Sequence, residues 1–187
     1  MSNDTLILNA DGIPLSVVPL STLNWQEAVK LMFMGRVEVL ASYDDWSVHS
    51  PSVEFQVPAV VMLNEYIKVD RSVRFSRSNV LLRDEYKCQY CGGNFCDNQH
   101  ELTLDHVVPR FNGGRTKWDN IVAACPKCNL EKSHYDHMKP NNAPRRPSYY
   151  ELVQKRMKHS IIVPHQSWSD FLGWDSSLVQ VKPPKAA

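Results

Sequence analysis

The sequence predicts an α+β protein in which a small mixed α/β unit is followed by a unit of two strands and a helix that carries four paired cysteines. Two C-x-x-C motifs, Cys88–Cys91 and Cys125–Cys128, are separated by 33 residues. The interval between them holds two β-prone runs, and Pro126 is placed to open a helix directly after the second motif begins. The segment ahead of the first motif mixes β-prone runs with one amphipathic helical pattern.

Length and composition already narrow the class of protein. The chain has 187 residues, of which 43% are hydrophobic and 22% are charged. This composition excludes a disordered, a fibrous and a cysteine-dense secreted chain. The longest apolar stretch, Val57–Leu63, is far shorter than the roughly 20 residues that span a bilayer, and residues 1–10 lack the basic flank of a signal peptide. We therefore expect a cytoplasmic protein with no membrane partner.

The formal net charge of +1 conceals a strong asymmetry along the chain. Residues 1–70 carry three basic and nine acidic side chains, a net charge of −6. Residues 71–158 carry sixteen basic and nine acidic side chains, a net charge of +7. Residues 159–187 carry two basic and two acidic side chains. We predict three parts with these boundaries: an acidic N-terminal unit, a basic domain and a C-terminal extension. A basic segment suits a polyanion, although an ordinary solvated surface explains the charge equally well.

The acidic N-terminal unit is predicted to contain one helix and several strands. Asn24 can cap a helix that starts at Trp25, and Gly35 can end it. Pro51 and Pro58 have no N–H to donate and are expected to confine the neighbouring strands to edges or bends. The β-prone runs lie at Thr5–Leu8, Val37–Leu40, Val53–Val57 and Ala59–Leu63.

Two further helices are predicted on either side of the cysteine-rich segment. Ser78 can cap a short helix over Asn79–Glu85, and a second helix is expected over Ser148–Lys158. The last residues, Pro183–Ala187, are expected to fray.

The four paired cysteines predict a metal site. Four thiolates on two tight turns match a tetrahedral structural site, and soft sulfur ligands favour Zn²⁺. A redox pair or a disulfide is the rival interpretation, but two separate motifs in a chain without a secretion signal favour zinc. Cys96 is the odd thiol, and a cysteine without a role is the simplest account of it.

The interval between the cysteine motifs predicts two strands followed by a helix. Leu102–Val108 and Ile121–Ala124 have strand composition, and a turn-rich loop joins them. The helix that follows would carry Cys128, Asn129 and Lys132. A metal bound by the cysteines would then hold this helix against the segment that precedes the strands.

The segment from Tyr86 to Ser133 contains a series of short motifs. In chain order they are Cys88-x-x-Cys91, Asp105-His106-x-x-Pro109-Arg110, Gly113-Gly114, Trp118-x-Asn120 and Ala124-Cys125-x-x-Cys128-Asn129-x-x-Lys132. In this order and at these distances, the motifs resemble the HNH nuclease family, whose shared fold is the ββα-metal finger. The N-terminal unit, with Leu8-Asn9 and Pro14-Leu15-Ser16-Val17-Val18, resembles an extension found in some bacterial and phage HNH proteins.

The resemblance implies a metal-dependent phosphodiester hydrolase. His106 matches the family's general base, and a neutral imidazole with an unperturbed pKa of about 6.5 accepts a proton from water at pH 7. Asn120 matches a residue that orients the base and shapes the loop. Asp105 and Asn129 would hold one divalent cation, whose oxygen ligands suit Mg²⁺ or Mn²⁺, and the cation would stabilise the leaving oxygen. Asn129 occupies the position of the last His in the HNH motif. A His at this position would accept softer metal ions than an Asn does.

Asp105 and His106 pose a geometric problem for this assignment. Adjacent residues of a strand face opposite ways, yet both are expected to serve one site. We expect the strand to bend or twist there, or the ion to lie at the edge of the strand.

The same segment supplies candidate contacts to the substrate. Contacts to phosphate supply affinity but read no sequence, so we expect duplex DNA to be nicked or cut with low sequence specificity. His134 and His137 are expected to be solvated rather than bound to metal. The candidate phosphate contacts are Arg110, Arg115, Lys117 and Lys132.

Other functions stay open at the level of sequence. A non-catalytic zinc-ribbon protein that binds DNA or acts as an adaptor would carry the same cysteines, and a ribonuclease or a component of a packaging machine would carry the same motif. The acidic N-terminal unit is a poor DNA clamp and is predicted to form a homodimer or to contact a partner protein. The resemblance implies the cytosol of a bacterium or of a phage-infected host.

Overall fold

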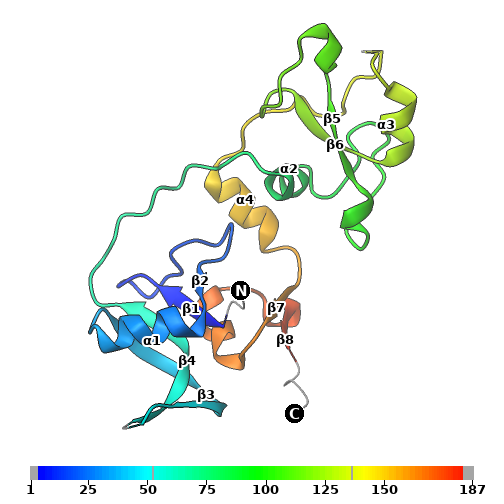
Figure 1. The fold of residues 1–187 in the computed structure, drawn as a ribbon. Helices are drawn as coiled ribbons and strands as arrows, with labels where there is room; N and C mark the ends of the chain where they lie inside the picture. The colour runs from blue at the N-terminus through cyan, green and yellow to red at the C-terminus, as the bar shows by residue number, and fades with distance from the viewer. Residues whose placement is uncertain (1–3, 52, 136, 183–187) are drawn as a thin grey trace. The chain divides into compact units, whose positions relative to one another are not determined.

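The chain folds into two compact units. One unit combines Met1–Arg71 with Met157–Ala187, and the other is Ser72–Arg156. The computed structural model describes residues 4–51, 53–135 and 137–182, so the predicted fraying of Pro183–Ala187 lies outside the described residues (Figure 1). Within these ranges, every helix is too short or too polar to cross a membrane.

A four-stranded sheet forms the centre of the first unit. Its strands are β1 (Thr5–Leu8), β2 (Thr22–Leu23), β3 (Val37–His49) and β4 (Glu54–Leu63), in the order β2-β1-β4-β3. Strand β1 pairs parallel to β4, and the other neighbours are antiparallel. Helix α1 (Trp25–Phe33) starts at the predicted cap, because the Asn24 side chain accepts a hydrogen bond from the Glu27 N–H.

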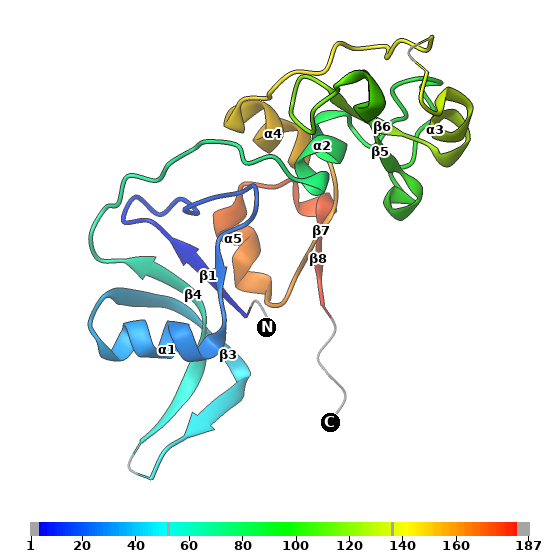
Figure 2. The same cartoon turned by 45° about the horizontal axis from the view of Figure 1, so that its top comes forward.

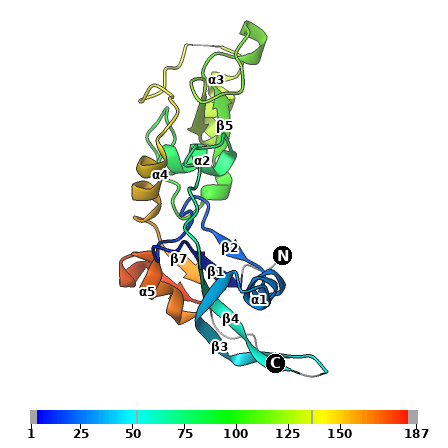
Figure 3. The ribbon, with the colours of Figure 1, turned by 90° about the vertical axis from the view of Figure 1, so that its left-hand side faces the viewer.

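Strand β4 differs from the prediction because it runs through Pro58 without a break. The partner of Pro58 is Ser42, at a point where the register of β3 is irregular, and the pairing with β1 begins only at Val60. The missing N–H therefore falls where the hydrogen-bond ladder is already interrupted. Figures 2 and 3 show the outer ends of β3 and β4 running on beyond β1.

Residues from the end of the chain complete the core of the first unit. They form β7 (Ile161–Val163), the 3-10 turns η3 (Gln166–Trp168) and η4 (Ser176–Leu178), α5 (Ser169–Leu172) and β8 (Val179–Val181). Trp168 is buried against Leu6 and Val60, and its indole N–H donates to the Ala59 carbonyl at 2.8 Å. The segment that the sequence predicts to be a C-terminal extension therefore packs into the same unit as the N-terminal segment.

The second unit has the predicted order of two strands and a helix. Strands β5 (Thr103–His106) and β6 (Ile121–Ala124) pair antiparallel, and α3 (Pro126–Lys132) lies beside β5 (Figure 1). The 3-10 turns η1 (Gln99–Glu101) and η2 (Arg110–Asn112) precede and follow β5. The α+β class and the mixed N-terminal unit are confirmed.

Two helices support this strand pair. Helix α4 (Tyr149–Arg156) lies within the predicted range, whereas α2 (Arg77–Arg83) begins two residues earlier than predicted. The cap is Ser76 rather than Ser78, because the Ser76 hydroxyl accepts the hydrogen bond from the Asn79 N–H. Both serines precede an apolar run, so only the observed hydrogen bond separates them.

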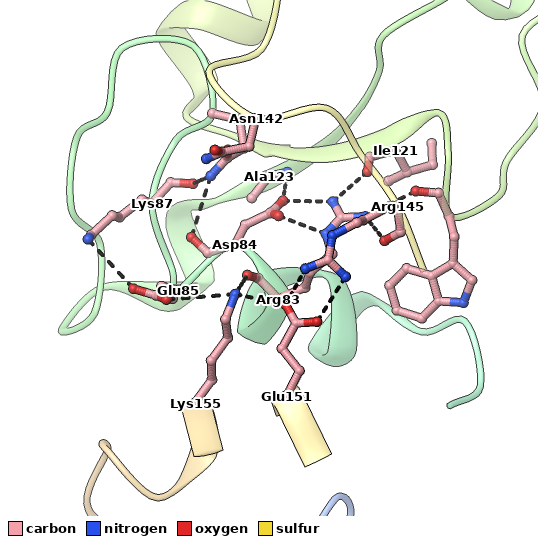
Figure 4. Close-up of polar contacts among 12 residues, drawn as sticks. Arg83, Asp84, Glu85, Lys87, Ile121, Ala123, Asn142, Arg145, Glu151 and Lys155 are labelled. Carbon is pink, nitrogen blue, oxygen red and sulfur yellow. Dashed lines mark hydrogen bonds and ion pairs between the residues drawn. The ribbon is translucent and has the colours of Figure 1, made fainter. Parts of the chain in front are cut away.

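A buried ion pair fastens α2 to β6. The Arg83 and Asp84 side chains are 5% and 7% exposed, and the guanidinium bonds both carboxylate oxygens at 2.8 and 2.9 Å. Arg83 also donates to the Ile121 carbonyl at 2.7 Å, while Asp84 accepts from the Ala123 N–H at 2.8 Å (Figure 4). Lys155 of α4 donates to the Arg83 carbonyl in the same network. The pair therefore joins three elements of the second unit.

We predict that Asp84→Asn destabilises the second unit by roughly 3–5 kcal/mol, because it leaves the buried Arg83 guanidinium without its counter-ion. Denaturant titration followed by hydrogen exchange at β5 and β6 measures the change. The matched control is Asp119→Asn, which breaks the exposed ion pair with Lys117 and should change stability little. Equal effects of the two substitutions would contradict the role given to the Arg83–Asp84 pair.

Candidate functional site

The four paired cysteines converge on one point in the second unit. Their sulfur atoms all lie within 4.8 Å of one another. Helix geometry places the second pair, since Cys125 caps α3 and accepts from the Cys128 N–H, with Pro126 in the first turn. The first pair lies on a tight turn in which the Gly92 N–H donates to the Cys88 carbonyl at 2.9 Å. The predicted cluster is confirmed, and its donors suit a metal ion.

The protonation of the cysteine thiols also depends on their surroundings. Burial raises the pKa of Cys128 above its usual range. Burial opposes ionisation of Cys88 as well, but backbone N–H donors from Cys91, Cys125 and Tyr90 outweigh it and lower the pKa of Cys88 to about 7. A cation bound by the four sulfur atoms would favour ionisation of all four thiols together.

Asp105 lies in β5 with its carboxylate held by two donors. The side chain of this residue is largely buried, and its Oδ2 atom accepts a hydrogen bond from the Tyr90 hydroxyl at 2.5 Å. The Lys132 ammonium lies 3.0 Å from the same Oδ2 atom. Burial and the contact with Asp105 raise the pKa of Tyr90, so the phenol stays protonated and remains a donor.

Lys132 does not occupy the position expected of a phosphate contact. Its side chain is 0% exposed, and its ammonium also donates to the His106 carbonyl at 2.7 Å. An ammonium that is buried and held by the Asp105 carboxylate and the His106 carbonyl cannot reach a phosphate in this structure. The expectation for Lys132 is therefore corrected: the residue holds two consecutive residues of β5.

His106 ends β5 with its ring partly exposed. Its Nε2 atom lies 2.8 Å from the Thr116 hydroxyl, in the loop that joins the two strands. Burial, followed by the charge of Arg110, lowers the pKa of His106, so the neutral ring predominates at pH 7. The side chains of Asp105 and His106 thus make different contacts, as strand alternation requires, Asp105 with Tyr90 and Lys132 and His106 with Thr116.

Asn120 shapes the loop that follows β5. Its amide accepts from the Val108 N–H at 2.8 Å and donates to the carbonyls of Val108 and Arg115 at 3.0 Å each. Gly114 closes the same loop, and a Cβ atom there would lie 1.8 Å from the Val108 carbonyl oxygen. Only glycine fits this approach, which explains the Gly-Gly motif.

Asn129 reaches β5 from the first turns of α3. Its amide N–H donates to the Thr103 hydroxyl at 2.8 Å. Thr103 and Asp105 lie two residues apart, so their side chains share one face of the strand. Asn129 and Asp105 are therefore brought to the same face of β5, where their oxygen atoms are of the kind that binds a hard cation.

The remaining candidates lie at the surface. Arg110, Arg115 and Lys117 are exposed on the loop between the two strands, although Lys117 is paired with Asp119 at 2.8 Å. His134 and His137 are exposed as well, which agrees with the expectation that they are solvated. The described cluster of potential metal ligands contains neither histidine.

Three contributors to the site were missed by sequence reasoning: Tyr90, Thr103 and Thr116. Tyr90 is an unspecified position of the first C-x-x-C motif, although a hydroxyl between two paired cysteines is a usable signal. The two threonines carry no signal of their own, because strand and loop positions accept threonine for many reasons.

Two family models match the chain. Residues 88–135 match the model of the HNH endonuclease, and residues 5–71 match the model of the HNH endonuclease-associated N-terminal domain. The first range contains all four clustered cysteines and the Asp-His pair of β5.

Two curated proteins resemble a part of the chain. A CRISPR-associated endonuclease Cas9 of Corynebacterium diphtheriae is 38% identical over 53 residues, which cover 28% of this chain and 5% of that protein. A CRISPR-associated endonuclease Cas9 of Actinomyces naeslundii is 33% identical over 63 residues, which cover 32% and 6%. The chain thus corresponds to a small part of these relatives. From the two family models and the geometry above, this chain carries an HNH endonuclease domain, preceded by an HNH endonuclease-associated N-terminal domain.

Proposed function

We propose that this protein is a metal-dependent DNA endonuclease that hydrolyses phosphodiester bonds of duplex DNA with low sequence specificity. The single observation that supports the proposal is the set of contacts around β5: the Lys132 ammonium binds both the Asp105 carboxylate and the His106 carbonyl, and Asn129 bonds Thr103 of the same strand. Phosphodiester hydrolysis needs an activated water and stabilisation of the leaving oxygen. The same residues provide groups for both tasks.

His106 is the proposed general base. When Nε2 donates to the Thr116 hydroxyl, the lone pair of the neutral ring lies on Nδ1 and can accept a proton, and the ring is partly exposed to water. The Thr116 hydroxyl at 2.8 Å from Nε2 fixes the orientation of the ring. Asn120 is the proposed positioning residue, because its three hydrogen bonds hold the loop that carries Thr116.

Asp105 and Asn129 are the proposed ligands of one Mg²⁺ or Mn²⁺ ion. One carboxylate oxygen and one amide oxygen match the hard ligands that these ions prefer, and few protein ligands leave positions for phosphate. The bound ion would act as a Lewis acid on the leaving oxygen. The proposed ion of the four-cysteine cluster is structural Zn²⁺, since a four-sulfur shell leaves no position for a reacting water.

The charge of the chain supports a nucleic-acid substrate. The net charge of +7 over residues 71–158 contrasts with −6 over residues 1–70, and exposed Arg110, Arg115 and Lys117 belong to the basic segment. Such cations bind phosphates without reading sequence. A dimer or a protein partner through the acidic unit and a cytoplasmic location stay predictions.

The proposed function is tested with supercoiled plasmid incubated with Mg²⁺, Mn²⁺, Ni²⁺ or Zn²⁺. Mg²⁺ or Mn²⁺ should support relaxation or linearisation, and His106→Ala should lower the rate by about 10²–10⁴-fold because the general base is lost. His100→Ala, which removes an exposed histidine of η1, is the matched control and should retain activity.

Asp105→Ala is a poorer test, because it leaves the buried Lys132 ammonium without its counter-ion. Full activity of His106→Ala would contradict the proposed mechanism. Tight DNA binding without cleavage in any of the four metals would favour a zinc-ribbon binding protein. Preferential digestion of RNA in a parallel assay would favour a ribonuclease.

A further inference from the structure

Tyr90 connects the cysteine cluster to Asp105. It lies between Cys88 and Cys91 in the first C-x-x-C turn, and its ring packs against the core that includes Cys125 and Cys128. Its hydroxyl donates to Asp105 Oδ2 at 2.5 Å. A single side chain therefore packs against the core that contains three of the cysteines and bonds the proposed ligand of the nuclease metal.

The two donors to Asp105 bind the same oxygen atom. Lys132 lies 3.0 Å from Oδ2, the atom that Tyr90 also contacts. Among the described residues, Oδ1 receives no hydrogen bond, and every fully buried side-chain polar atom in this part of the chain has a partner. Oδ1 is therefore the atom that stays accessible. Two donors on Oδ2 fix the plane of the carboxylate and leave Oδ1 for a cation.

We propose that Tyr90 is a positioning residue for the nuclease metal and that it couples the occupancy of the four-cysteine site to metal affinity at Asp105. The inference rests on the proposed function, because Asp105 and Asn129 are taken as the ligands. A metal among the cysteines fixes the turn that carries Tyr90, the Tyr90 hydroxyl fixes Asp105, and Lys132 completes the support from α3. Coupling between two binding sites is reciprocal, so each metal increases the affinity for the other.

The test measures Mn²⁺ affinity by electron paramagnetic resonance on the whole chain with its cysteine site loaded with zinc. Tyr90→Phe keeps the ring and removes only the hydroxyl. It should weaken Mn²⁺ binding by about ten- to a hundredfold, as loss of an outer-shell partner does at other metal sites. Zinc content and thermal stability are measured on the same samples and should not change.

Tyr135→Phe is the matched control. The Tyr135 hydroxyl makes no hydrogen bond with any described residue of the same unit, so its removal should leave Mn²⁺ affinity unchanged. Equal Mn²⁺ affinity in the Tyr90→Phe protein and the unmodified protein would overturn the inference alone. Loss of zinc from Tyr90→Phe would also overturn it, because the hydroxyl would then serve the cysteine site. Absence of Mn²⁺ binding in the unmodified protein would overturn both the inference and the proposed metal ligands.

A different observation concerns the surface beside His106. Phe111 is 90% exposed in η2, the turn that follows β5. The backbone of the loop around it is held by the hydrogen bonds of Asn120 and by the close approach of Gly114, so this loop presents Phe111 to the solvent. An exposed phenylalanine on a rigid loop at a proposed active site is more typical of a contact surface than of packing.

The charges around Phe111 indicate which partner it contacts. Arg110, Arg115 and Lys117 are exposed on the same loop. Asp119 is the single acidic residue among residues 107–119, so this loop carries a net charge of +2. Exposed cations and an exposed aromatic ring on one loop are a combination with which proteins bind phosphates and stack on bases. A protein partner or a lipid surface does not require both features together.

We infer that Phe111 stacks on a base, or enters a base step, next to the bond that is cut. This inference also rests on the proposed function. The test uses a duplex with 2-aminopurine near the cut and the His106→Ala protein, which binds without cutting. Binding should change the 2-aminopurine fluorescence, and Phe111→Ala in the same protein should abolish that change and weaken the affinity by about 5–150-fold. Phe111→Trp should restore both.

Ile162→Ala, which removes a 67% exposed side chain from β7, is the control and should change neither readout. Unchanged affinity and fluorescence in Phe111→Ala would overturn the stacking inference while leaving the nuclease assignment intact. Lost affinity with an unchanged 2-aminopurine signal would overturn it too, since the contact would then not involve a base. Failure of the His106→Ala protein to bind duplex at all would overturn the stacking inference together with the duplex substrate.

Discussion

The convergence of four cysteine sulfurs is the constraint on which the rest of the second unit depends. It joins the turn before β5 to the first turn of α3, two segments that are far apart in sequence. With only 85 residues in that unit and two strands of four residues each, burial of apolar surface alone gives limited stability. Because Asn129 and Lys132 follow Cys128 on the same short helix, fixing the helix start also fixes both side chains against β5.

The buried contacts around β5 link stability to chemistry. Lys132 is fully buried and has Asp105 as its counter-ion, so the carboxylate that is the proposed metal ligand also stabilises the fold. The Arg83–Asp84 pair also stabilises the fold, by bonding to β6, but it has no proposed role in the chemistry. Substitutions at Asp105 therefore affect folding as well as the proposed metal binding, whereas the His106 side chain is partly exposed and has no buried counter-ion to lose.

Sequence reasoning located the features that depend on residue type and spacing. The cysteine pairs, the helix start at Pro126 and strand β6 follow from ligand chemistry, proline geometry and composition, and each is confirmed. What it could not supply are facts about partners distant in sequence. Burial of Lys132 depends on contacts with β5, and the role of Tyr90 depends on a hydroxyl that reaches a residue 15 positions away. Likewise, Pro58 lies within one strand because its partner strand is irregular at that point.

The central claim is that one chain holds a structural metal among four cysteines and a second, oxygen-bound metal at Asp105. The most direct measurement is anomalous X-ray scattering at the zinc and manganese edges, from crystals of this chain grown with Mn²⁺. We expect a zinc peak among the four sulfur atoms and a separate manganese peak in contact with Asp105 Oδ1 and Asn129. Manganese bound away from both residues, or a cysteine cluster without a metal peak, would contradict it.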